Sequence, residues 1–315
     1  MKEKRKSSAK LTTGPVVRTL VSMALPMMVG IVGMVAFHLV DTFFVGRLGT
    51  MQLAAMSFTF PVVLVVSSIA RGLGVGTSSV LARAIGAGDH HRIQRLTTDG
   101  LVLSLLIVIT FVIAGLFTIE PLFRLLGAGD DIMPLIKTYM SIWYWGMPFV
   151  VIPMVGNNAI RATGDTRTPS LIMVVAILIN MVLDPVLIFG PGPFPRLELA
   201  GAAIATVIAR AVTLVVSLLV LWRREKMLSF EIPRLREVLE SWKRILFVGI
   251  PAAGTLIIIP LAMGIVPRLV SAYGAESVAG FGVASRIEMF AGTPVIALST
   301  VLIPFIGQNL AARGT

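Results

Sequence analysis

Four residues with oxygen-bearing side chains stand inside long apolar stretches of the sequence: Asp41, Asn180, Asp184 and Thr206. Asn180 and Asp184 are four residues apart, so a helix would present both on one face. Two carboxylates, an amide and a hydroxyl are hard oxygen ligands, which suit Na⁺ or can hold a proton. Ionisable groups are costly inside a membrane, where they usually mark a functional position. These residues therefore predict a cation-binding site that takes either Na⁺ or H⁺.

The composition indicates a membrane protein. Hydrophobic residues make up 56% of the chain, charged residues 14%, and the mean hydropathy is +0.91. A soluble protein needs more polar surface to cover its core. The absence of cysteine excludes disulfides, thiolate nucleophiles and cysteine metal sites, and three histidines do not form a metal cluster. The net charge of +11 comes from basic residues between the apolar runs, which fits membrane topology better than a nucleic-acid-binding face.

About 20 apolar residues cross a bilayer as a helix. Eight stretches meet this length: 18–46, 51–82, 98–118, 133–160, 168–189, 200–222, 245–272 and 276–308. Most contain proline, which removes a helical hydrogen bond and can bend the helix, and we expect Pro26 to act in gating. The sequence thus predicts an all-α polytopic membrane protein with eight transmembrane helices and no leader peptide.

Lysine and arginine set the predicted orientation. Nineteen of them lie in the N-terminal segment and every second loop after it, and five lie in the alternate loops. The positive-inside rule places the N-terminus in the cytoplasm of a multi-pass protein of the cell (inner) membrane. All four candidate cation ligands then fall at similar depth in the outer half. Either aspartate alone could be a boundary residue within a turn of water, but their shared depth favours a site.

A shift of 225 residues aligns the last two predicted spans with the first two, and places Pro26 on Pro251. Internal repeats are common in secondary transporters. We therefore expect a six-helix unit over 1–225, followed over 226–315 by a basic linker and the first two helices of a second unit. On this reading the second unit is truncated.

Several segments resemble the multidrug and toxic compound extrusion (MATE) family, in its archaeal and DinF-like branch. They are ALPMMVG, VDTFFVGRLGTMQLAA, GVGTSSVLARAIGAGD, NNAIRATGDTRTPS, NMVLDPVLIFG, GAAIATVIAR and GQNLAA. The resemblance implies twelve helices in two six-helix lobes around a central cavity. It also implies that Asp41, Asn180, Asp184 and Thr206 occupy the cation-site positions of the first lobe.

The second unit departs from the other main bacterial branch, which carries a glutamate eight residues after the proline of its seventh helix. That position here is Ile259, and Val266 stands at the repeat position of Asp41. We therefore expect ion coupling to reside in the first lobe. Tyr139 and Asn157 are candidates for substrate contact in the cavity, although each could instead satisfy a buried backbone group.

The predicted function is export of organic, cationic or amphipathic solutes in exchange for H⁺ or Na⁺, by alternating access. The sequence has no Walker lysine motif and no Ser/His/Asp arrangement, so we expect neither an ATP motor nor an enzyme, and no cofactor. The run from Arg71 to Gly76 is not a nucleotide fingerprint, because no strand precedes it. We expect Arg71 to reach the inner interface, whereas Arg210 lies deeper.

The expected partners are a small organic solute and membrane lipid, with no nucleic acid, and the protein is expected to be a monomer. Two alternatives remain. One is a lipid-linked saccharide flippase of the same superfamily, which would need a cationic cavity for pyrophosphate. The other is a membrane scaffold or receptor that transports nothing.

Overall fold

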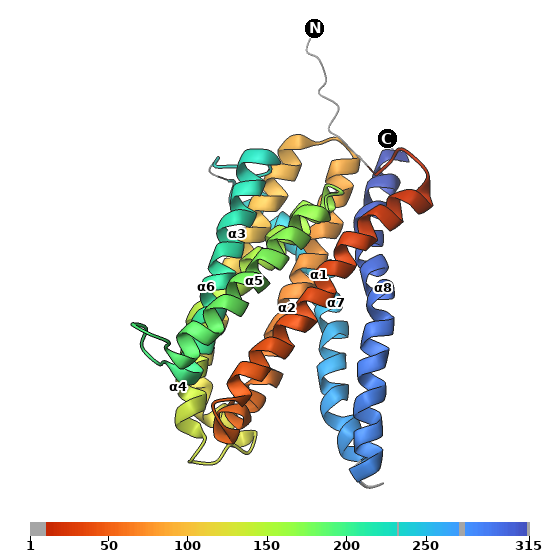
Figure 1. Ribbon diagram of the computed structural model, residues 1–315. Coiled ribbons are helices and arrows are strands. Elements are labelled where there is room, and N and C mark those ends of the chain that lie inside the picture. Colours follow the sequence, from red (N-terminus) through yellow and green to blue (C-terminus); the bar gives the residue numbers. More distant parts are fainter. Residues whose placement is uncertain (1–10, 232, 271–274, 314–315) are drawn as a thin grey trace.

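The computed structural model describes residues 11–231, 233–270 and 275–313, except for most side chains between 259 and 290. Its helices are α1 (Val16–Gly46), α2 (Thr50–Gly86), α3 (His90–Leu125), α4 (Met133–Ala162), α5 (Arg167–Phe189), α6 (Glu198–Leu219), α7 (Leu235–Val270) and α8 (Ala275–Arg313). A π-helical turn, Val220–Arg224, continues α6. The described residues form no strand. As Figure 1 shows, the helices run up and down beside one another, which confirms the predicted all-α architecture.

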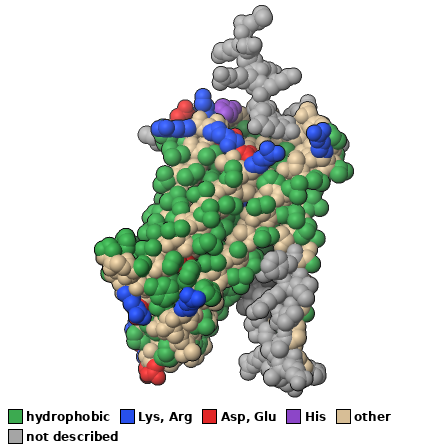
Figure 2. Space-filling view, in the orientation of Figure 1, with side chains coloured by type: hydrophobic (Ala, Val, Ile, Leu, Met, Phe, Trp, Pro, Cys, Tyr) green, Lys and Arg blue, Asp and Glu red, His purple; other side chains and the backbone are tan. Residues whose placement is uncertain are grey.

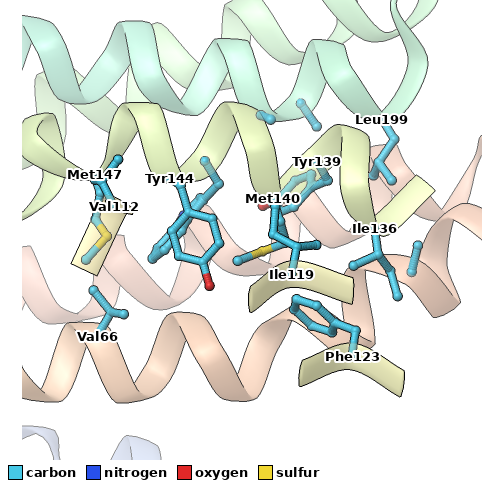
Figure 3. Close-up of a cluster of buried hydrophobic side chains, with 14 of the residues drawn as sticks. Val66, Val112, Ile119, Phe123, Ile136, Tyr139, Met140, Tyr144, Met147 and Leu199 are labelled. Carbon is cyan, nitrogen blue, oxygen red and sulfur yellow. The ribbon is translucent and has the colours of Figure 1, made fainter. Parts of the chain in front are cut away.

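Each predicted apolar stretch coincides with one helix. Within the described part of the chain, seven helices are long and apolar enough to cross a membrane, and α4 is not among them. The reason is visible in Figure 3, where α4 carries Tyr139, Met140, Tyr144 and Met147 into the main core and packs against α2, α3 and α6. A helix that faces protein on most sides can use aromatic and polar residues that lipid-facing helices avoid. The outer surface is mostly hydrophobic, as Figure 2 shows for one face.

The last two helices pack on the first two through small residues. A side chain at Gly72 would collide with Ala253 of α7, and one at Gly76 would collide with the backbone of α7 at Ile245. Small residues four apart let membrane helices approach closely. The glycine-rich run after Arg71 is therefore a helix-packing surface.

The contacts of α8 agree with the 225-residue shift. That shift places Ala82 on Gly307 and Gly86 on Ala311, and each of these pairs lies in close contact between α2 and α8. The same shift places Gly72 on Ala297 and Ala24 on Gly249. Gly72 of α2 contacts Gly249 of α7, and Ala24 of α1 clusters with Ala297 of α8, so the two contacts correspond. The helix contacts thus repeat in register, while the division into units 1–225 and 226–315 remains a prediction.

One end of the bundle gathers the α2–α3, α4–α5 and α6–α7 connections with the start of α1 and the end of α8 (Figure 1). The predicted spans 51–82 and 98–118 leave Arg95 in the loop between them, and that placement was wrong. Asp89 accepts a hydrogen bond from the Arg92 N–H (3.0 Å), which caps α3 and starts it at His90. Arg95 is therefore inside α3, buried and paired with buried Asp99 at 2.6 Å.

A second polar cluster at this end joins α5 to the end of α6. The Asp165 carboxylate accepts hydrogen bonds from the Thr168 N–H (3.0 Å), from the Thr168 hydroxyl (2.6 Å) and from Arg224. Partial burial alone would raise the pKa of Asp165, but the hydrogen bonds from Thr168 and Arg224 outweigh it and lower the pKa overall. The cluster ties three chain segments together outside the spans.

Candidate functional site

Three of the four predicted cation ligands lie buried together near the other end of the bundle. Asp41 on α1 is 4% exposed, and Asn180 and Asp184 on α5 are 1% and 0% exposed. Asn180 Nδ2 donates to Asp184 Oδ1 at 3.1 Å, as expected for residues one turn apart on one face. The carboxylates of Asp41 and Asp184 are close enough to interact electrostatically. Packing of α1 against α5 thus brings together two acids that are 143 positions apart in the chain.

Tyr139 belongs to the same cluster. It is buried on α4, where Met133 begins the helix with Pro134 directly after it, and it interacts electrostatically with both aspartates. Sequence analysis named Tyr139 as a candidate for substrate contact or for satisfying a buried backbone group. The structure places it near the acid pair, without a hydrogen bond to either carboxylate among the described residues, and its contact with substrate stays a prediction.

Thr206 is half-buried on α6 and, among the described residues, makes no hydrogen bond to either aspartate. Its membership of the cation site stays a prediction. Asn157 lies five residues before the end of α4, away from the acids, and its buried Oδ1 has no hydrogen-bond donor among the described residues. Asn157 therefore remains a candidate for a polar contact in the opposite half of the lobe.

Pro26 lies within α1, and the helix continues through it. One turn earlier, the buried carbonyl of Met23 accepts a hydrogen bond from the Thr166 hydroxyl at 2.9 Å. Pro26 has no N–H to give to the Ser22 carbonyl one turn earlier, and the Thr166 hydroxyl holds the same turn through the neighbouring Met23 carbonyl. The segment also packs on α8, because Ala24 and Met27 cluster with Ala297. It therefore links the helix that carries Asp41 to the helices that follow the first unit.

The donor set fits a proton or Na⁺. Asp41 Oδ1 and Asp184 Oδ2 are buried, and no donor among the described residues reaches either atom. Buried acceptor oxygens without partners are destabilising unless a proton or a cation satisfies them. The described residues contain no cluster of three His, Asp or Glu side chains that would indicate a transition metal. The site thus offers hard oxygen ligands, and its assignment as a cation site stays a prediction.

Arg210 of α6, which sequence analysis placed deep in a span, lies against α1, with its guanidinium 5.4 Å from the ring centre of Phe37. His38 follows Phe37 on α1, and the two rings are in edge contact. The sequence signal for these two residues was spacing, because His38 is three residues before Asp41 and Arg210 is four residues after Thr206.

In the second unit, Val266 is half-buried on α7, and the side chain of Ile259 is outside the described residues.

Known proteins were compared with the chain. The family model MatE matches residues 26–186. A protein of Shewanella oneidensis named FAD transporter is 45% identical over 305 residues, which cover 96% of this chain and 67% of that protein. A transporter of the MOP superfamily from Pyrococcus furiosus, described as having a binding pocket of reverse polarity that suggests a different function, matches with a TM-score of 0.84 and 31% identity over 99% of this chain and 68% of its own.

A solved outward-facing multidrug resistance transporter of the MATE family matches with a TM-score of 0.88 and 32% identity, over 97% of this chain and 67% of its own. The chain thus spans about two thirds of the length of these relatives. The family model covers more than half of the chain, and the Shewanella relative aligns with 96% of it at 45% identity. Together with the membrane-spanning helices, these matches show that the chain belongs to the MatE family of multi-pass membrane transporters.

Proposed function

We propose that the protein exports organic solutes in exchange for H⁺ or Na⁺, with the cation held by Asp41 and Asp184. The observation that carries the proposal is the buried acid pair, in which each carboxylate has one oxygen without a donor among the described residues. Such a pair binds a cation strongly when both acids face it and poorly when they separate. We place the N-terminus in the cytoplasm, so that the acid pair opens toward the outside, and the protein acts as a monomer.

The coupling follows from the helix that carries Asp41. A ligand shifts a conformational equilibrium only by its differential affinity for the two states. Asp41 lies on α1 and Asp184 on α5, so cation binding favours the arrangement that keeps these two helices together. Because α1 also packs on α8 around Ala24 and Ala297, a change in α1 alters the contact with the second unit. In the proposed cycle, the cation enters from outside, reshapes α1 around Pro26, and drives release of the solute outward.

A second candidate concerns the solute. Sequence analysis favoured a cationic or amphipathic compound, and the outward-facing relative is named for multidrug resistance. The Shewanella relative is named for FAD, an organic anion, and the Pyrococcus relative is described as having a pocket of reverse polarity. Arg71 and Arg210, which have no carboxylate within 4.0 Å among the described residues, favour export of such an anion over export of a cationic drug.

Solute efflux from everted membrane vesicles tests the proposal, with ΔpH and ΔNa⁺ imposed separately and with the chain completed through its second six-helix unit. We expect one of the two gradients to drive efflux of a fluorescent cation or of a flavin, and Asp41→Asn to abolish that drive. An exposed acid on the opposite end of the bundle, Asp89, provides the control substitution Asp89→Asn, which should leave efflux intact. Efflux that is independent of both gradients would contradict ion coupling.

A further inference from the structure

The segment before α1, the end of α4 and the end of α8 meet at one buried amide side chain. Gln308 of α8 is 0% exposed. Its Nε2 donates a hydrogen bond to the Ala162 carbonyl, in the last residue of α4, at 2.6 Å. Its Oε1 accepts a hydrogen bond from the Leu11 N–H at 3.3 Å. One side chain thus joins segments that lie 146 and 297 positions away from it in the chain.

Leu11 fills the space between these segments. Its carbonyl accepts a hydrogen bond from Asn309 Nδ2 at 3.0 Å, so both backbone polar groups of Leu11 bond to α8. Its side chain is 5% exposed and clusters with Met23 of α1 and Val301 of α8. It also lies against Gly164, where φ is +94° and a Cβ would come within 3.0 Å of Leu11 Cδ2. The segment before α1 is therefore packed between the α4–α5 turn and α8.

This contact lies at the end of the bundle where the start of α1 and the end of α8 come together with the α4–α5 connection (Figure 1). The end of α2 also approaches α8 there, because a side chain at Gly86 would collide with the Gln308 carbonyl. A buried amide that loses a partner is destabilising until water replaces that partner. Gln308 therefore favours two arrangements, one closed with both partners and one open enough to admit water.

We propose that Gln308 and Leu11 form a latch between the first unit and α8, and that this latch must open before a solute enters from its end of the bundle. The inference rests on the proposed function in one respect, that transport proceeds by alternating access. Access from this end requires the ends of α4 and α8 to separate, and Gln308 belongs to one and bonds to the other. Packed contacts of this kind switch between discrete arrangements rather than stretch. Gln308 is thus a positioning residue that acts through the helix ends it holds.

The test is cysteine alkylation in the full 315-residue chain, which has no cysteine of its own. Ala162→Cys is the latch reporter and Ala55→Cys is the core reporter. Both alanines are 0% exposed, and Ala55 lies near the start of α2, toward the opposite end of the bundle. Each chain is placed in phosphatidylcholine nanodiscs and treated with N-ethylmaleimide, which reacts when the buried position opens. We expect Gln308→Ala to raise the alkylation rate of the latch reporter about tenfold or more, because buried groups lose their partners, and to leave the core reporter unchanged.

Thr300→Val is the matched control on α8. The Thr300 hydroxyl donates only to the Ile296 carbonyl of its own helix, at 2.9 Å, so its loss should leave both reporters unchanged. Asn309→Ala removes one of the two hydrogen bonds that hold Leu11 and keeps the Gln308 amide in place. It should raise the rate of the latch reporter by a smaller factor, about threefold, and it tests the latch even if Gln308→Ala does not fold.

A functional arm uses the chain completed through its second six-helix unit. Leu11→Cys and Asn309→Cys are joined by a short reducible cross-linker, since the Asn309 amide reaches the Leu11 carbonyl. The cross-link should stop solute efflux from everted vesicles, and reduction should restore it. The latch is overturned by unchanged efflux from the cross-linked protein, by a latch reporter that reacts alike in Gln308→Ala, Asn309→Ala and the parent, or by equal increases at both reporters in both variants. If the completed chain shows no gradient-driven efflux at all, the antiport proposal fails, and the two reporters still decide whether the latch exists.

Discussion

Replacing Asp184 by asparagine tests the cation site most directly. Asp184 is 0% exposed and accepts a hydrogen bond from Asn180 Nδ2 at 3.1 Å. An asparagine keeps the shape and one oxygen that can accept this bond, so we expect folding to be largely preserved. The negative charge that faces the cation is lost. Hydrogen bonds to charged groups contribute about 1.5–3 kcal/mol, so the affinity for the coupling ion should fall about 10- to 150-fold.

The assay is thermal unfolding of the purified chain while Na⁺ is titrated at fixed pH, followed by the same scan across pH for the proton. A ligand at about 100 times its Kd stabilises the folded state by about 2.7 kcal/mol, and hundredfold weaker binding leaves about 0.4 kcal/mol. Asp184→Leu is the control for folding, because it leaves the buried Asn180 amide without an acceptor. That loss should cost about 1–3 kcal/mol even without ions.

Asp41→Asn should have the same effect as Asp184→Asn, because the two carboxylates hold one ion. The double variant should be little worse than either single one, as for residues that act as a unit. Asn180→Ala should weaken ion affinity without removing it. If Asp41→Asn and Asp184→Asn both keep ion-dependent stabilisation and gradient-driven efflux, the acids serve the fold alone and the assignment of the cation site is refuted.

Three further outcomes are expected. Single cysteines can be introduced into this cysteine-free chain and labelled with impermeant reagents. Cysteines within 225–231 should react only from the cytoplasmic side, and cysteines within 191–196 only from outside. Reversed labelling would invert the proposed orientation. Gly76→Leu should destabilise the chain by about 1–3 kcal/mol or more in thermal unfolding, because it forces α7 away, whereas Gly254→Ala, which meets open space, should not. Hydrogen bonds lower the folded-state pKa of Asp165, so its contribution to stability is present above about pH 4 and is lost as the pH falls through the lowered value. Asp165→Asn should therefore flatten the acid limb of the stability profile, and an unchanged limb would contradict the role of that cluster.

Much of the fold could be predicted because each span in a bilayer must satisfy its own backbone hydrogen bonds, which leaves length and hydropathy as readable signals. Helix α4 was predicted as a span from its length, and it runs along the bundle as predicted (Figure 1), but its polar and aromatic residues reflect burial in protein rather than contact with lipid. Arg95 was misplaced because hydropathy does not report helix ends. The capping residue Asp89 and the four-residue spacing of Arg95 and Asp99 carried that information.

The sequence by itself determined which helices form and at which end of the bundle the Lys and Arg residues gather. It also determined that Asn180 and Asp184 share a helix face. All three depend on local composition or on fixed helical geometry. Only the tertiary structure decided that Asp41 and Asp184 lie close enough to interact electrostatically, that Tyr139 is buried near them, and that Arg210 lies against Phe37. The physical reason is that helical periodicity fixes relations within a helix, whereas relations between helices depend on how closely their surfaces approach. Here that approach is set by small residues such as Gly72, Gly86 and Gly307, whose role appears only when the opposing helix is in place.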